Sequence, residues 1–331
     1  MPRSIVCSRC LLAVLLLGAG LAGAAESSDD AEAWLRRMID AVQSLDYEGT
    51  FVYLRGSRLE SMRLVHLNDG EHERERLLSL NGDAREVIRN EHAVTCIRSD
   101  AGEVFKGQPG TRRMFSALLA SGLDDLKSHY AFASVGSYRV AERPAEVVAI
   151  IPRDAYRYGY RLYLDKHNAL PLKTDLMDES GNPLEQIMFT SLHVGSDVDR
   201  GEIPSPIAEG HESTGPRESA EDPPAAQAPA SRWRVAILPP GFSLTSQGRH
   251  GGASGKIEHL VFSDGLASLS VYIEKLDPGA EVGLSGGSRM GPVSAFGTRV
   301  DGHQVTAVGE VPPATARLAA ESVESLGTAT P

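Results

Sequence analysis

Apolar positions along the chain first recur at the spacing of a helix and later at the spacing of strands. The helical stripe begins close to Asp29 and Glu32, which stand at the spacing of a capping box. Its members are Trp34, Leu35, Met38, Ile39 and Val42. A single apolar stripe must be covered, so we expect this helix to pack against the segments that follow.

Strand-like runs follow in quick succession. Asn-Gly and Asp-Gly pairs between several of them accept the positive φ angles of tight hairpin turns, which predicts antiparallel pairing. We expect strands at about 49–54, 62–67, 72–80, 84–89, 93–98, 131–140, 145–151, 156–165, 171–177 and 184–194. A second amphipathic helix is expected at about 112–127.

The run at 156–165 shows two faces most clearly. One side carries Tyr156, Tyr158, Tyr160, Leu162 and Leu164, and the other side is mostly polar. A sheet of about ten strands with one apolar face must curl or be covered. For residues 25–195 we therefore predict a mostly β fold, a large unclosed antiparallel β-barrel with helices in its concavity.

Composition changes at residues 196–230, where Pro, Ala and acidic residues dominate and predict a linker. Residues 231–331 resume the strand pattern, at about 232–237, 242–245, 257–262, 266–276, 292–300 and 304–310. Pro312-Pro313 then opens a helix. Its apolar stripe consists of Ala316, Ala319, Ala320, Val323 and Leu326. This part of the chain is predicted to be a smaller α+β domain.

The first 24 residues have the form of a secretory signal. A basic end is followed by a short leucine-rich run and by Ala22-Gly23-Ala24, which suits signal-peptide cleavage. The apolar run is too short to span a bilayer. Cleavage would leave Cys96 as the only cysteine, so no intramolecular disulfide can form, and a buried small hydrophobe is favoured over a reactive thiol. The net charge of −11 argues against nucleic-acid binding.

Motifs for catalysis are absent from the sequence. The glycine-rich stretch 251–256 resembles a phosphate loop, but His250 and Ile257 stand where that motif requires Gly and Ser or Thr. The 10 histidines are scattered, without the paired spacing of a metal site. We therefore predict no enzymatic activity, no metal and no cofactor.

Several short motifs occur in a fixed order across both halves of the chain. They are Tyr-Glu-Gly-Thr-Phe-Val-Tyr at 47–53, Glu-Arg-Leu-Leu-Ser-Leu-Asn-Gly at 75–82, and the segments at 85–87, 152–160, 170–173, 238–242, 263–267 and 308–312. Together they resemble the MucB/RseB family of periplasmic regulators of the envelope-stress sigma factor. The resemblance covers roughly residues 30–195 and 232–325.

This resemblance implies a mechanism and a set of partners. Family members bind the periplasmic segment of a membrane-spanning anti-sigma factor and shield it from the first, site-specific protease. The large domain is similar to the lipoprotein carriers LolA and LolB, and lipid or lipopolysaccharide fragments release the anti-sigma factor. The small domain holds the anti-sigma segment. A second copy of the chain, in a homodimer, is kept as a further possible partner.

Candidate site residues follow from the strand faces. For lipid we expect Phe51, Tyr53, Met114, Phe115, Leu118, Leu119, Tyr158, Tyr160 and Leu162. For an anionic head group we expect Arg153, Arg157 and Arg161, although the polar back of a barrel strand also accounts for these arginines. For the protein partner we expect Phe242, Leu269, Tyr272 and Arg299.

Two other functions compete with the regulator. A periplasmic lipid or lipoprotein carrier of the LolA/LolB type would need the first domain alone, and the second domain argues against it. A hydrolase that uses Ser or His in the concavity lacks any supporting motif.

Overall fold

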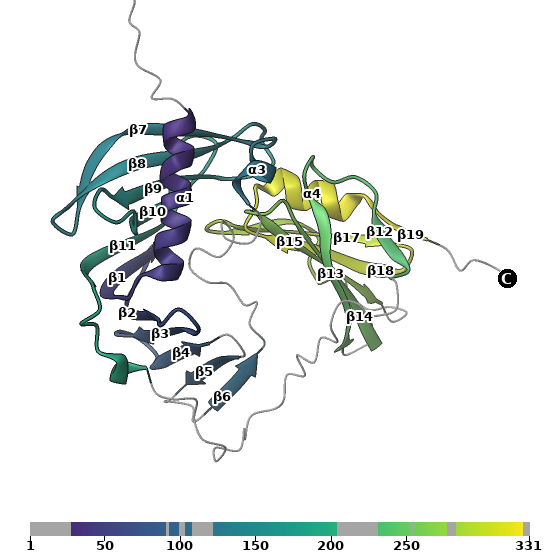
Figure 1. Cartoon of the computed structure of the whole chain (residues 1–331). Helices are drawn as coiled ribbons and strands as arrows, with labels where there is room; N and C mark the ends of the chain where they lie inside the picture. Colours follow the sequence, from purple (N-terminus) through teal and green to yellow (C-terminus); the bar gives the residue numbers. More distant parts are fainter. Residues whose placement is uncertain are drawn as a thin grey trace, which may run out of the picture.

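The computed structural model describes residues 28–90, 93–98, 103–107, 122–203, 231–252, 255–276 and 283–326. The predicted signal segment, most of the predicted linker and most of the predicted helix at 112–127 lie outside these ranges. The described chain forms two main sheets, which Figure 1 shows side by side.

The larger sheet has eleven strands in the order β6-β5-β4-β3-β2-β1-β11-β10-β9-β8-β7. The strands are β1 (Tyr47–Arg55), β2 (Arg58–Asn68), β3 (Glu73–Ser79), β4 (Arg85–Arg89), β5 (Val94–Arg98), β6 (Glu103–Gly107), β7 (Tyr130–Val140), β8 (Arg143–Pro152), β9 (Gly159–Asp165), β10 (Pro171–Met177) and β11 (Pro183–Val194). All neighbours pair antiparallel, and β6 and β7 remain as edges. The prediction of a large unclosed antiparallel sheet is confirmed.

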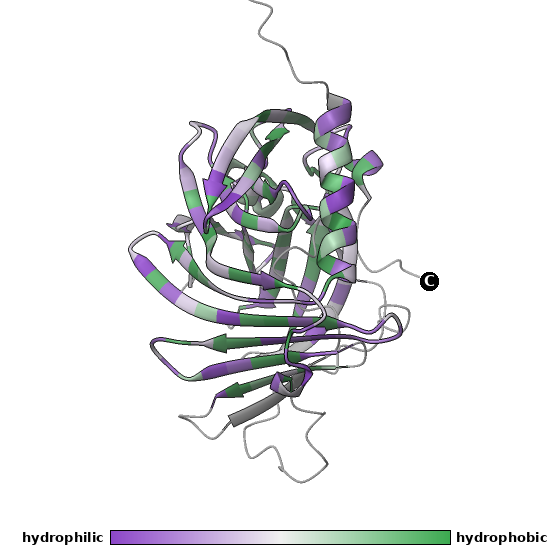
Figure 2. Ribbon diagram, turned by 60° about the vertical axis from the view of Figure 1, so that its left-hand side comes forward, coloured by the Kyte–Doolittle hydropathy of each residue, from purple (hydrophilic) through white to green (hydrophobic). Residues whose placement is uncertain are grey.

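Helix α1 (Ser28–Ser44) covers one face of this sheet at its β7–β8 end (Figure 1). Leu35 and Met38 from its stripe are completely buried against Phe51, Leu64 and Leu162. Figure 2 shows hydrophobic and hydrophilic positions alternating along several strands of the sheet. The alternation places the main core on the α1 face, and two smaller apolar clusters lie apart from that core.

Strand β9 begins at Gly159, three residues later than the alternation predicts. Asp154 Oδ1 accepts the backbone N–H of Tyr156 at 2.9 Å, and this local turn replaces strand pairing. Tyr156 and Tyr158 therefore lie in the loop between β8 and β9. Tyr160 and Leu162 pack on the α1 side of the sheet, as their alternation predicts.

The helix predicted at 112–127 is described only at its end, as α3 (Leu123–Leu126). Both leucines of this short helix are buried in the core that α1 covers. Met114, Phe115, Leu118 and Leu119 lie outside the described residues.

The smaller sheet has six strands in the order β13-β14-β15-β18-β17-β16. They are β13 (Ser243–Gly252), β14 (Gly255–Ser263), β15 (Ser268–Lys275), β16 (Gly286–Met290), β17 (Val293–Val300) and β18 (His303–Gly309). Helix α4 (Pro313–Glu321) packs on one face of it, over β17 and β18. The glycine-rich stretch at 251–256 forms the far end of the β13–β14 hairpin, where Gly252 pairs with Gly255.

The last helix is shorter than the sequence predicts. It ends at Glu321, and Val323 belongs to β19 (Val323–Ser325), which pairs with β12 (Trp233–Val235). Ala316, Ala319 and Ala320 form the buried stripe, whereas Leu326 is exposed. Small alanine side chains let the helix approach the sheet closely, and Val323 joins the same core from a strand.

The packing of α1 generates a stability prediction. Leu35→Ala removes a side chain that is 0% exposed and should lower the free energy of unfolding by about 2–5 kcal/mol, because a cavity remains beneath the helix. Gln43→Ala on the exposed side of the same helix should change it by less than about 0.5 kcal/mol. Urea denaturation measures both values, and equal midpoints for the two variants would show that α1 does not hold the core together.

Candidate functional site

A buried ion pair joins the two sheets. Arg157, in the loop between β8 and β9, donates from Nη1 to Oδ2 of Asp264 in the β14–β15 turn, at 2.6 Å. Both side chains are 0% exposed. Nη2 of the same guanidinium donates to the backbone carbonyl of Pro240 at 2.6 Å, and Asp154 lies within 3.0 Å of it. One arginine therefore holds its own loop and two segments of the other unit.

Asp264 also binds groups from both units. Its Oδ1 accepts the backbone N–H groups of Leu266 and Ala267 at 2.9 and 2.7 Å, which fixes the β14–β15 turn. Its Oδ2 also accepts the hydroxyl of Tyr130 from β7, at 2.9 Å. Burial, with the Asp264 charge as a second cause, holds the pKa of Tyr130 far above its usual value, so this hydroxyl remains a donor.

Apolar and backbone contacts close the junction around this pair. The guanidinium carbon of Arg157 lies 5.5 Å from the ring centre of Tyr130 and 5.3 Å from that of Phe242. Leu266 from the β14–β15 turn packs into the core under α1. The Thr315 hydroxyl, near the start of α4, donates to the Tyr156 carbonyl at 2.6 Å.

Gly241 marks how closely the two units approach. Its φ is +89°, and a Cβ there would lie 2.3 Å from Nε2 of His129, which precedes β7. Any other residue at this position would be strained in its backbone and would push the imidazole aside. Glycine is therefore required for this docking.

The predicted anion site is not assembled. Arg157 is already paired with Asp264, so it cannot serve a head group. Arg153 donates to the backbone carbonyls of Lys127 and Tyr130 at 3.1 and 3.2 Å. Arg161 is exposed on the sheet face opposite α1. The three arginines stand four residues apart and would share one face of a continuous strand. The turn at Asp154 interrupts that strand, so they do not share a face.

The predicted lipid residues are divided between two places. Phe51 and Leu162 are 2% and 1% exposed and pack in the closed core beneath α1, with Tyr160 at its border. The Tyr53 hydroxyl donates to Glu185 at 2.7 Å, and burial raises the pKa of this tyrosine. Tyr158 lies at the junction, where Arg289 of β16 approaches its ring to 6.0 Å.

The described side chains next to α1 are tightly packed, with Leu35 and Met38 both 0% exposed. The gap between Tyr47, Leu170 and Phe189 is too small for a water molecule. A lipid could reach Phe51 or Leu162 only if α1 moved away. The sequence predicts the apolar face of the sheet, but it does not predict how closely α1 packs against that face.

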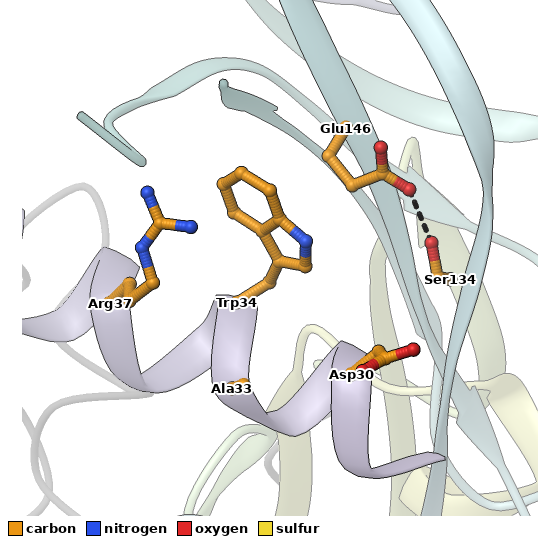
Figure 3. Close-up of a pocket in the computed structure, with 6 residues that line it drawn as sticks. All are labelled: Asp30, Ala33, Trp34, Arg37, Ser134 and Glu146. Atoms are coloured by element: carbon orange, nitrogen blue, oxygen red, sulfur yellow. Dashed lines mark hydrogen bonds between the residues drawn. The ribbon is translucent and has the colours of Figure 1, made fainter. Parts of the chain in front are cut away.

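A small polar hollow of about 210 Å³ lies at the edge of this region (Figure 3). Arg37 stands over the Trp34 ring at 4.2 Å, and Glu146 accepts from the Ser134 hydroxyl and pairs with Lys166. The described residues contain no cluster of histidine, cysteine or acidic side chains that could hold a metal ion. Nor does any helix among them have the length and apolar character to cross a membrane.

The predicted partner residues also divide. Phe242 and Leu269 are buried in the core between the six-stranded sheet and α4, so they cannot contact another protein. Tyr272 lies on the opposite face, stacked on His259 with ring centres 4.3 Å apart. Arg299 is exposed on that same face, by strand register. No described helix covers this face, so it is the candidate surface for a polypeptide.

The sequence pattern does not single out Asp264 or Tyr130 as site residues. Asp264-Gly265 predicts only a hairpin turn, which the structure confirms, and Tyr130 lies just outside the predicted strand at 131–140. The partners are separated by 107 residues, so no local pattern pairs Arg157 with Asp264.

Comparison with known proteins gives the family. The N-terminal domain model of the MucB/RseB family matches residues 30–207, and its C-terminal domain model matches residues 227–324. The sigma factor AlgU regulatory protein MucB of Pseudomonas aeruginosa is 36% identical over 318 residues, which cover 94% of this chain and 96% of MucB. The sigma-E factor regulatory protein RseB of Escherichia coli is 29% identical over 300 residues, 88% of this chain and 90% of RseB.

Solved structures of MucB have the same fold. The complex structure of P. aeruginosa MucA/MucB superposes with a TM-score of 0.72 at 33% identity, covering 90% of this chain and 100% of that one. A crystal structure of MucB gives a TM-score of 0.58 at 32% identity, with 90% and 98% covered. With both halves of its sequence matched and its two-sheet fold shared, this chain belongs to the MucB/RseB family.

Proposed function

We propose that this protein binds the periplasmic segment of a membrane-spanning anti-sigma factor and shields it from the first protease that would cleave it. It acts as a regulator and not as an enzyme, in keeping with its relatives, which are named as regulatory proteins. A crystal structure of MucB in complex with MucA(peri) superposes on this chain with a TM-score of 0.71. The periplasm is the proposed location, reached through the secretory signal at residues 1–24.

One observation carries this proposal furthest. The TM-score is 0.72 against the MucA/MucB complex and 0.58 against the crystal structure of MucB, at nearly equal identity and coverage. This chain therefore superposes better on the MucA/MucB complex than on the crystal structure of MucB, which supports the binding of a comparable partner.

The junction explains how such an arrangement persists. Arg157 and Asp264 have lost contact with water, and each keeps its opposite charge from the other unit only while the two units stay docked. Separation would expose the pair and withdraw Leu266 from the core under α1. The partner surface, with Tyr272 and Arg299, is thus held at a fixed orientation to the larger sheet.

Release by lipid or lipopolysaccharide fragments is the second part of the proposal. It rests on the family resemblance, because the predicted lipid residues Phe51 and Leu162 are covered by α1. The carrier alternative would need the first domain alone, and the second domain, which the C-terminal family model matches, speaks against it.

The protection assay tests the function directly. Adding the purified protein to the anti-sigma periplasmic segment should slow cleavage by the first protease, because the bound segment is withheld from the protease. The rate of segment cleavage is followed on a gel, with the protease's action on an unrelated peptide as the control. An unchanged rate at saturating protein would refute the proposed function.

A second prediction concerns the junction. Arg157→Met leaves Asp264 buried without its cation, which destabilises the docked arrangement by about 3–5 kcal/mol. The affinity for the anti-sigma segment should fall by about tenfold or more, because only the docked fraction binds.

Arg161→Met is the matched control, since Arg161 is an exposed arginine four residues away. It should bind the segment like the unmodified protein in isothermal titration calorimetry. Equal affinities for the two variants, with circular dichroism showing both folded, would mean that the ion pair plays no part in partner binding.

A further inference from the structure

A second hollow lies on the face of the larger sheet opposite α1. It has a volume of about 440 Å³ and crosses β7 to β10 beside the loop that carries Arg157. Strand register places this hollow on the sheet face away from α1. Ile150 and Leu162 face α1, so the residues that alternate with them along β8 and β9 point the other way. This hollow is separate from the filled core in which the sequence predicts a lipid site.

Its floor is apolar and partly open to solvent. Ala149 and Met177 form the buried floor, each 9% exposed. Ile151 and Val135 border it and are 47% and 52% exposed, which is unusual for large hydrophobic side chains. Gly159 lines the hollow and lets β9 pack closely on β8, since a Cβ there would lie 2.9 Å from the Ile150 carbonyl oxygen.

One cation stands beside this floor. Arg161 forms no hydrogen bond or ion pair with any residue that the structure describes. Asp175, its neighbour across β9 and β10, is already bound by Lys173 and Gln186 at 3.0 and 2.8 Å. The guanidinium is therefore available for an anion from outside.

Acidic groups stand at the other end of the hollow. Asp178 accepts backbone N–H groups of Ser180 and Asn182 within its own turn, and these bonds hold its pKa below the usual range. Glu179 is exposed beside it. An anionic group would be repelled there and attracted at Arg161, so the charges give the site a direction.

We propose that this hollow binds a single acyl chain ending in a carboxylate or phosphate, with the chain on the Ala149–Met177 floor and the anion at Arg161. The proposal specifies the lipid-dependent part of the function proposed above. Acyl-chain binding itself does not depend on that function, whereas its effect on the anti-sigma segment does. The wall of the hollow includes Asp154 and Arg157, so an occupant would contact the loop that forms the junction.

Laurate is the probe for the experiment, which uses the full mature chain. Calorimetric titration should show saturable binding of laurate, and Arg161→Gln should weaken it by about fivefold, as expected for one solvent-screened ionic contact. The same variant should leave the weaker binding of uncharged dodecyl maltoside unchanged. Arg139→Gln, at an exposed arginine of β7 that pairs with the exposed Glu142, is the matched control.

Two variants test the floor. Ala149→Trp fills the hollow, and Ile151→Asp places a charge on its exposed border, where folding tolerates it better. Both should abolish laurate binding while the protection assay without laurate still succeeds. Laurate binding that survives both folded variants, or that is equal in Arg161→Gln and Arg139→Gln, would overturn the proposal.

The function proposed above can fail separately. If the protection assay fails while laurate binds as described, the hollow is a lipid site on a protein of another function. If Ile151→Asp instead weakens binding of the anti-sigma segment and laurate never binds, the hollow accepts an apolar side chain of the protein partner, and the acyl-chain proposal is overturned.

Discussion

The ion pair between Arg157 and Asp264 is the interaction on which the arrangement of this protein depends. Both charges are withdrawn from water. Their other partners come from their own turns, as Asp154 and the N–H groups of Leu266 and Ala267 do, and from distant segments, as the Tyr130 hydroxyl and the Pro240 carbonyl do. In a low-dielectric interior an unpaired member of such a pair is far more costly than the pair itself. The two sheets are therefore docked through one geometry in which the pair, the Pro240 carbonyl and the Tyr130 hydroxyl all meet.

This constraint ties together features that are distant in sequence. The Asp154 turn that delays the start of β9 also positions Arg157, and Gly241 lets the backbone approach His129 closely enough for Pro240 to accept a hydrogen bond. On one side of the junction, α1 covers the β7–β8 end of the larger sheet. On the other side, no described helix covers the face of the smaller sheet opposite α4. This face carries Tyr272 and Arg299, and Leu284 lies over it at Gly297 and Gln304. A fixed junction holds that face, the proposed partner surface, at one orientation to the larger sheet.

Local patterns in the sequence were sufficient for most of the fold. The period of two in β7 to β11 and the Asp-Gly turn at Asp264 predict the strands and hairpins correctly, because these depend on neighbours in the chain. The junction could not be predicted, since its partners are 107 residues apart and each has an ordinary local role. The filled interior could not be predicted either. Whether Leu35 and Met38 leave space above Phe51 depends on how the side-chain volumes pack, and the spacing of apolar residues along the chain does not specify this.

The most direct test measures the distance between the two sheets before and after the partner binds. Spin labels on Arg139→Cys and Lys275→Cys, in a chain with Cys96→Ser, report this distance by double electron–electron resonance; both positions are exposed. A docked junction predicts one narrow distance distribution that the anti-sigma segment leaves unchanged. A broad distribution that narrows or shifts only when the segment is added would contradict a preformed arrangement held by Arg157 and Asp264.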